Sequence, residues 1–274
     1  MSALLPNDGY AAGYHPTMLD YLTLHTLERC ASFFTPHLRA GMSLLDAGCG
    51  PGTITVGLAP LIAPGGRLTA IDVSEDEVRK TRRVLESSGY GSAHVQVADV
   101  RGLPFEDCSF DAVFSQAVLD YLPDPVPAIH EFRRVLRPGG VIGLRSLNND
   151  YALVGPRNEL VEESLALFRR AVQAGGGDVT RGRLLGRMLS DARFERIFTQ
   201  PSYLRAESPE EWQSFCRIIG TSAAGGRFAE TALREGWVDE ARLADIAEAW
   251  ERFGADSSNF LGLAWGQALG FKPA

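Results

Sequence analysis

The middle of the chain alternates short apolar runs with stretches whose apolar residues recur at helical spacing. Such alternation is typical of a parallel sheet that helices cover on both faces. The apolar runs predict strands over residues 43–45, 67–71, 95–98, 110–115 and 141–145. The amphipathic stretches predict helices over residues 53–61, 74–88 and 128–136. Residues 42–146 are therefore expected to form a doubly wound α/β sheet.

The two ends of the chain follow other patterns. Residues 16–38 have the apolar spacing of one helix, and beyond residue 146 the strand–helix alternation stops. Further helices are predicted over residues 160–174, 184–192, from Ser208 onward and 239–253. Residues 194–201 and 260–271 are predicted to form two more strands.

The first strand runs into a glycine-rich loop, L-L-D-A-G-C-G-P-G, at residues 44–52. Gly48 and Gly50 permit positive φ and let a ligand approach the bare backbone. The helix that follows would offer unpaired N–H groups at its N-terminus. The loop is therefore expected to hold a polar small molecule against the main chain.

A dinucleotide fingerprint would have a third glycine where Thr53 stands. The second strand ends in Asp72, which suits hydrogen bonds to ribose hydroxyls, and the third ends in Asp99. NAD enzymes and S-adenosylmethionine enzymes share the acid at the second strand. The turn L-R-P-G-G at residues 136–140 then precedes the fifth strand.

This series over residues 42–146 resembles class I S-adenosylmethionine-dependent methyltransferases, in particular the group with the ubiquinone/menaquinone methyltransferases. The resemblance implies a seven-stranded, Rossmann-like sheet whose antiparallel last strand would lie in residues 258–274. Residues 1–41 would form a helical cap, 42–206 the cofactor-binding core with a helical segment at about 151–180, and 207–257 a helical lid. The terminal parts resemble actinobacterial methyltransferases of the small-molecule type.

The resemblance implies S-adenosylmethionine as the cofactor. Asp72 would bind both ribose hydroxyls, Val73 would pack on the adenine, and Asp99 would accept from the adenine amine. The full set of expected cofactor contacts is Tyr14, Asp46, Gly48, Cys49, Gly50, Asp72, Val73, Asp99, Val100, Ser115 and Gln116.

Catalytic candidates are few. The resembling family often has a histidine at position 120 or 121, whereas this chain has Asp120 and Tyr121. Asp120 could serve as a base, or it could be a capping or loop carboxylate. His15 is the histidine most suited to act as a base or cofactor contact, although a lone histidine is more often structural. His25 stands in a helix pattern and is interpreted as structural.

Candidate substrate contacts come from two places. A polar cluster after the fifth strand offers Arg145, Asn148 and Tyr151, with a solvated loop as the alternative. Trp212 and Phe215 could line an apolar pocket, although aromatics at helical spacing are more often core.

Charge and cysteine usage narrow the class of partner. The 274 residues carry a net charge of −7, with no Lys/Arg run, which argues against a nucleic-acid substrate. No apolar stretch is long enough for a membrane span. The four cysteines stand far apart, without a C-x-x-C motif, which argues against a disulfide framework and a zinc site. We expect a cytoplasmic monomer or homodimer without a metal.

The expected function is transfer of a methyl group from S-adenosylmethionine to a small molecule, with a secondary metabolite as the expected acceptor. A non-methylating enzyme, such as a cyclase that keeps the cofactor as a scaffold, is the main alternative. A protein or nucleic-acid methyltransferase is disfavoured by the charge and by S-Q-A-V at residues 115–118, where an N/D-P-P-Y type motif would stand. Thr53 and the L-R-P-G-G turn disfavour a dinucleotide oxidoreductase.

Overall fold

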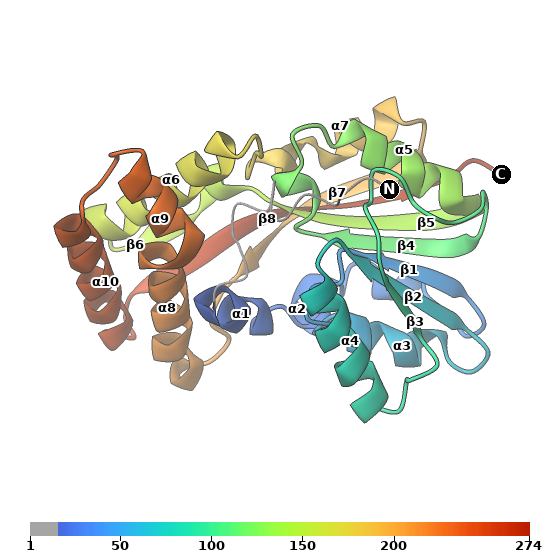
Figure 1. Ribbon diagram of the computed structural model, residues 1–274, viewed down its shortest axis with the longest axis horizontal. Coiled ribbons are helices and arrows are strands. Elements are labelled where there is room, and N and C mark those ends of the chain that lie inside the picture. Colours follow the sequence, from blue (N-terminus) through green and yellow to red (C-terminus); the bar gives the residue numbers. More distant parts are fainter. Residues whose placement is uncertain (1–15) are drawn as a thin grey trace.

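The computed structural model describes residues 16–274, with side chains from Asp20 onward. Within this range the chain forms an eight-stranded sheet in the order β3-β2-β1-β4-β5-β8, and both β6 and β7 also pair with β8 (Figure 1). The first five strands are parallel neighbours, and β8 is antiparallel to β5. The strands are β1 (Ser43–Ala47), β2 (Arg67–Asp72), β3 (His94–Val97), β4 (Phe110–Gln116), β5 (Leu136–Leu147), β6 (Leu153–Gly155), β7 (Glu195–Leu204) and β8 (Phe260–Phe271). The predicted α/β sheet with an antiparallel last strand is confirmed.

Helices cover both faces of this sheet. One face carries α3 and α4, which contact β1, β2 and β3, and the other carries α5 and α7, which contact β5, β7 and β8 (Figure 1). The Ser74 side chain caps α4 by accepting from the Glu77 N–H, as its place before the helix predicts. The helices are α2 (Leu27–Cys30), α3 (Thr55–Ile62), α4 (Glu75–Ser87), α5 (Val126–Val135) and α7 (Leu185–Asp191).

A second group of helices lies beyond the carboxyl end of β5. Its members pack on one another (Figure 1). They enclose a buried apolar cluster that includes Trp250 and Phe215. The helices of this group are α1 (Pro16–Thr23), α6 (Glu159–Ala174), α8 (Pro209–Ala224), α9 (Gly226–Arg234) and α10 (Glu240–Ala255). The chain enters α8 from β7 and returns from α10 into β8, so three helices stand between the last two strands.

Two local predictions were wrong, and two elements were not predicted. The single helix expected over residues 16–38 is broken between α1 and α2, because Thr26 caps a new helix by accepting from the Arg29 N–H. The fifth strand begins at Leu136 rather than at residue 141. Neither the short strand β6 nor the separate helix α9 was predicted. The break between α1 and α2 matters for the site, because His25 lies in it and not in a helix.

Candidate active site

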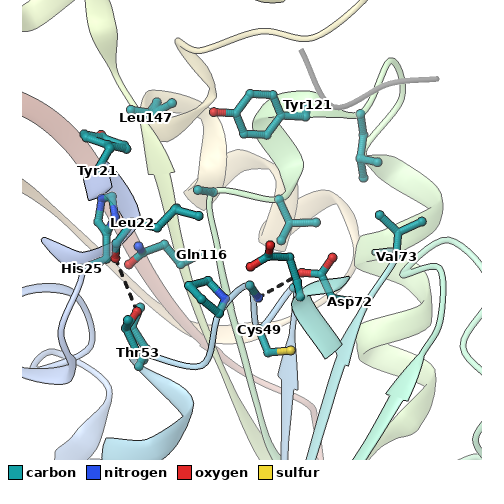
Figure 2. Close-up of a pocket in the computed structure, with 18 of the residues that line it drawn as sticks. Tyr21, Leu22, His25, Cys49, Thr53, Asp72, Val73, Gln116, Tyr121 and Leu147 are labelled. Atoms are coloured by element: carbon teal, nitrogen blue, oxygen red, sulfur yellow. Dashed lines mark hydrogen bonds between the residues drawn. The ribbon is translucent and has the colours of Figure 1, made fainter. Parts of the chain in front are cut away.

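A single cavity of about 280 Å³ connects the carboxyl ends of the parallel strands with the second group of helices. Its wall includes the loop after β1, the ends of β2, β4 and β5, and residues of α1, α6, α8, α9 and β8. Figure 2 shows Asp72 and Val73 on one side of the cavity and Tyr21, Leu22 and His25 on the other. We call these two regions the loop end and the helical end.

The glycine loop forms the floor of the loop end. Gly48 and Gly50 both have positive φ, +87° and +52°. The loop N–H groups are largely engaged within the protein: those of Gly48 and Cys49 donate to the Ile71 carbonyl, and that of Gly50 donates to Asp72. These three N–H groups therefore stabilise the loop itself. A β-carbon on Gly50 would point into open space, so the bare backbone there faces room for a ligand.

Two carboxyl groups brace this loop, the buried Asp46 and the partly buried Asp72. Asp46 Oδ2 accepts from the Thr55 hydroxyl at 2.6 Å, and burial raises the pKa of Asp46 to about 7. Asp72 accepts from the N–H groups of Gly50 at 3.0 Å and Ser74 at 2.9 Å. Burial raises the pKa of Asp72, while these two N–H groups oppose that rise. Both carboxyl groups line the cavity, and a carboxylate oxygen that accepts one hydrogen bond can accept another.

The far wall of the loop end carries an ion pair. The Arg101 guanidinium donates hydrogen bonds to both carboxylate oxygens of Asp99, with Nε 3.0 Å from each oxygen and Nη2 2.6 Å from Oδ2. This hydrogen-bonded guanidinium lowers the pKa of Asp99. Arg101 lines the cavity beside Asp99 and was not predicted. Any ligand amine at Asp99 would have to share the carboxylate with Arg101.

Most of the other expected cofactor contacts also line the cavity. Cys49, Val73, Val100 and Gln116 do so, and burial raises the pKa of the Cys49 thiol. Ser115 does not, because its buried hydroxyl donates to the Ala47 carbonyl at 2.7 Å and ties β4 to the end of β1.

The three catalytic candidates have different environments. Tyr121 lines the cavity (Figure 2). Asp120 is fully buried and lies outside the cavity wall, where its Oδ2 accepts from the Leu147 N–H at 3.3 Å. Burial raises the pKa of Asp120 to about 8. His15, and with it Tyr14, lies outside the described residues.

The structure does not bring the substrate candidates to the cavity wall. Arg145 is buried outside the wall, and Tyr151 is 55% exposed to solvent. Asn148 does not line the cavity, whereas the next residue, Asn149, does. Phe215 is in the apolar core of the second helix group, and Trp212 packs there with its Nε1 donating to the Asp256 carbonyl at 3.0 Å. The core interpretation of both aromatics therefore agrees with the structure.

The residues that do line the helical end were mostly missed by sequence reasoning. Most are apolar, and two of them, Phe168 and Phe228, meet edge to face with ring centroids 4.7 Å apart. The described residues at this end are Tyr21, His25, Leu147, Asn149, Ser164, Leu165, Phe168, Ile219, Ser222, Ala223, Phe228, Leu263 and Trp265. Helical amphipathicity could flag α6 and α8 as helices with a buried face, but no local signal says that this face meets a cavity.

A family model described as a methyltransferase domain matches residues 38–200, which include the glycine loop and the carboxyl ends of β1 to β5. The chain belongs to the class I S-adenosylmethionine-dependent methyltransferases. An uncharacterized methyltransferase of Schizosaccharomyces pombe is 28% identical over 95% of both chains. A probable methyltransferase of Aspergillus luteorubrus is 32% identical, over 64% of this chain and 64% of its own length.

Two further relatives carry the name of a reaction. Nocamycin O-methyltransferase of Saccharothrix syringae is 36% identical over 39% of this chain and 38% of its own length. The ubiquinone/menaquinone biosynthesis C-methyltransferase of Hahella chejuensis is 34% identical over 48% of this chain and 54% of its own length. This methyltransferase therefore matches the relatives of named reaction over less than half of its own length.

Solved structures share the fold. The cyclase SpnF has a TM-score of 0.54 and 22% identity, with 98% of this chain and 89% of that chain covered. A phosphoethanolamine N-methyltransferase of Haemonchus contortus, solved with S-adenosyl-L-methionine, has a TM-score of 0.55 and 16% identity, with 93% and 53% covered. At these identities the likeness establishes the architecture alone.

The residues of the loop end fit the cofactor of this family. Gly50 leaves space where a side chain would stand, Asp72 presents a partly desolvated carboxyl group, and Val73 and Val100 add apolar surface. When bound, S-adenosylmethionine supplies an activated methyl group on a positively charged sulfur. The protein's own contribution is to hold the acceptor in line with that group and to exclude water.

Proposed function

We propose that this methyltransferase acts on a small, largely apolar acceptor that binds at the helical end of the cavity. One observation carries the proposal: a single continuous cavity runs from Asp99 at the loop end to Trp265 at the helical end. Cofactor and acceptor have to share one space for the methyl group to pass directly between them. The helical end is the part of this cavity that the cofactor-binding residues do not line.

The chemistry of the helical end supports an apolar acceptor. Its wall is built from aliphatic and aromatic side chains, with polar groups at a few positions only. Small-molecule sites commonly combine an apolar wall with a few polar groups that fix orientation. A protein or nucleic-acid substrate would need an open groove or a basic face, and the net charge of −7 supports neither.

We further propose that α8 and α9, within the inserted residues 207–257, act as a lid. Ile219 and Ser222 of α8 and Phe228 of α9 contribute to the same cavity as the glycine loop. A cover at this place would keep water from the reacting centre and select acceptors by shape. The proposed roles of Asp72 at the ribose and of Asp99 at the adenine belong to the same arrangement.

The wider setting is also a proposal. The O-methyltransferase relative is named for nocamycin, which supports a secondary metabolite as the acceptor. All four cysteines are free thiols, which supports a reducing compartment such as the cytoplasm, and we expect a monomer or a homodimer there. No helix among residues 16–274 is long and apolar enough to cross a membrane.

The decisive experiment measures product mass. The protein is incubated with S-adenosylmethionine that carries an isotopically labelled methyl group, together with fractionated small-molecule extracts. A product that gains one labelled methyl group is expected. A product isomeric with its precursor, formed without label, would instead support the cyclase alternative. Asp72→Asn provides the control, because it should reduce labelling through cofactor binding while the protein stays folded.

A further inference from the structure

Four side chains from distant parts of the sequence form a contiguous cluster at the helical end. His25, in the break between α1 and α2, lies edge to face with Tyr21 at 4.8 Å and with Trp265 at 5.5 Å between ring centroids. The guanidinium of Arg145 stacks over the Trp265 ring, with its central carbon 3.9 Å from the ring centroid. Tyr21, His25 and Trp265 line the cavity, and Arg145 lies behind Trp265.

The sheet register explains this stacking. Arg145 on β5 pairs with Gln267 on β8, and Leu147 pairs with Trp265. Side chains two residues apart on neighbouring strands share a face, so Arg145 and Trp265 are diagonal neighbours. His25, from the chain break before α2, contacts the Trp265 ring edge to face.

The cluster contains buried polar atoms without partners. Among the described residues, neither ring nitrogen of His25 nor Nε1 of Trp265 has a hydrogen-bond partner. His25 is 3% exposed and Trp265 is 1% exposed. Buried polar groups in folded proteins are nearly always hydrogen-bonded, so unpaired nitrogen atoms on residues that line a cavity point to a ligand that completes them.

Arg145 adds an uncompensated charge. It is 1% exposed, and among the described residues its side chain donates hydrogen bonds to Gln116 Oε1 at 3.2 Å and to Cys30 Sγ at 3.5 Å. Within residues 20–274 no carboxylate forms an ion pair with it, and its Nε and Nη2 have no partner there. Burial lowers the pKa of Arg145, but a guanidinium stays protonated in proteins. A buried cation without an ion-pair partner is costly, so an anionic ligand bound close to Arg145 would be stabilised by its charge.

The surrounding titratable groups do not supply that anion. Burial, with the charges of Arg145 and Arg29, lowers the pKa of His25 to about 3, so the imidazole is neutral at pH 7 and carries one N–H donor. Asp120 interacts electrostatically with Arg145, but burial raises the pKa of Asp120 to about 8, which favours its neutral, protonated form at pH 7. The acids that line the described cavity wall, such as Asp72 and Asp99, belong to its loop end.

We propose that His25 and Trp265, with the charge of Arg145 behind them, form an oxyanion-binding subsite that makes the acceptor an acidic hydroxyl compound, an enol or a phenol, bound as its anion. This inference rests on the proposed acceptor site and names its substrate class. The hydroxyl proton leaves to water before the acceptor is enclosed. The oxyanion's electron pair then forms the new O–CH₃ bond while the S–CH₃ bond breaks and its pair stays on sulfur. No base on the protein is needed, which agrees with the absence of a suitably placed charged acid among the described residues of the helical end.

A pair of matched probes tests the subsite without turnover. 4-Nitrophenol ionises to a yellow anion, whereas 4-nitroanisole is its methyl ether and cannot ionise. Both are titrated into the full chain in the presence of S-adenosylhomocysteine, which fills the loop end. We expect the protein to bind the phenolate at least tenfold more tightly than the anisole and to lower the apparent pKa of bound nitrophenol, read from its absorbance. Equal affinities for both probes, or binding of neither, would overturn the proposal.

Trp265→Phe gives the sharpest variant. It removes Nε1 but keeps an aromatic ring for the Arg145 guanidinium. Phenolate affinity should fall roughly tenfold or more, as expected for one hydrogen bond to a charged group, while anisole affinity changes less than about twofold. Trp212→Phe is the matched control, because Trp212 lies outside the cavity, and it should leave both affinities unchanged. An equal loss for both probes in Trp265→Phe would show that the tryptophan only shapes the wall.

His25 and Arg145 are tested by conservative exchange. His25→Phe should weaken phenolate binding, and His25→Gln should restore most of it because an N–H donor returns. In Arg145→Lys the pKa of bound nitrophenol should stay lowered, because the positive charge remains. In Arg145→Gln it should return toward the value in water, provided that circular dichroism shows both variants to be folded. If Arg145→Gln does not fold, the variants at Trp265 and His25 test the subsite without it.

The two proposals fail in different ways. Loss of labelled methyl transfer with intact phenolate selectivity would refute the proposed function but not the subsite. Labelled methyl transfer without phenolate selectivity would refute the subsite alone.

Discussion

Gly48 packs directly against the side chain of Val118, and a β-carbon on Gly48 would overlap the Val118 Cγ2 atom. The two residues belong to the loops that follow β1 and β4, so this contact sets how closely the two loops approach beneath the cavity. Glycine at position 48 is required twice, by this contact and by its φ of +87°.

Gly48→Ala should therefore destabilise the fold and displace the loop. We expect a loss of about 2–4 kcal/mol in the free energy of unfolding, from left-handed backbone strain and overpacking together. Urea unfolding measures it. Gly50→Ala is the matched control, because Gly50 has φ of +52° but open space around its missing β-carbon. That variant should lose only about 1–2 kcal/mol. Equal losses in the two variants would show that the Val118 contact adds nothing.

Asp72→Ala should weaken cofactor binding by about 1.5–3 kcal/mol, because it removes charge-assisted hydrogen bonds to two ribose hydroxyls. Calorimetric titration with S-adenosylhomocysteine gives the dissociation constant. Asp72 also accepts from the Gly50 and Ser74 N–H groups, so Asp72→Asn, which keeps one acceptor oxygen, separates loop support from direct binding. Asp191→Asn on the exposed surface of α7 is the control. An unchanged affinity in folded Asp72→Ala would show that this carboxylate does not hold the ribose.

Local sequence signals predicted the sheet, and most of the residues that they singled out as cofactor contacts line the loop end of the cavity. A parallel strand buried on both faces is a short apolar run, and an acid such as Asp72 at its end marks the carboxyl edge of the sheet. These features depend on residues close together in the sequence. Their positions in space follow once the strand order is known from the family resemblance.

The helical end could not be predicted in the same way. His25 reaches the cavity only because the helix breaks before Thr26, a break that the apolar spacing of residues 16–38 hides. Trp265 stands in an uninterrupted apolar strand, where periodicity cannot tell which face meets a cavity. The spacing of Trp212 and Phe215 correctly gives a buried face of α8, but it cannot say whether a core or a ligand covers that face.

Asp120 should make stability depend on pH. Burial raises its pKa from 3.8 to about 8, so between these values the folded protein keeps a proton that the unfolded chain has lost. The free energy of unfolding therefore falls as the pH rises through this window. Asp120→Asn should reduce that fall, while the contribution of Asp46, whose pKa is also raised, remains. Urea midpoints at about pH 5 and about pH 8 measure the difference. Asp124→Asn, at an exposed position, is the control and should leave the pH dependence unchanged. A wild-type and an Asp120→Asn curve that stay parallel would contradict the assignment.

Ile219→Trp should separate acceptor binding from cofactor binding. Ile219 is 5% exposed on α8 and lines the helical end, so a larger ring at this position would fill the space proposed for the acceptor. Overpacking should cost about 1–3 kcal/mol of stability. Affinity for S-adenosylhomocysteine should stay within about twofold, because the loop end is untouched, while labelled methyl transfer should fall at least tenfold. Leu233→Trp on the exposed side of α9 adds the same ring away from the cavity and should leave both measurements unchanged. If Ile219→Trp lost cofactor affinity as strongly as methyl transfer, the two ends of the cavity would not be separate subsites, and the acceptor would have to enter elsewhere.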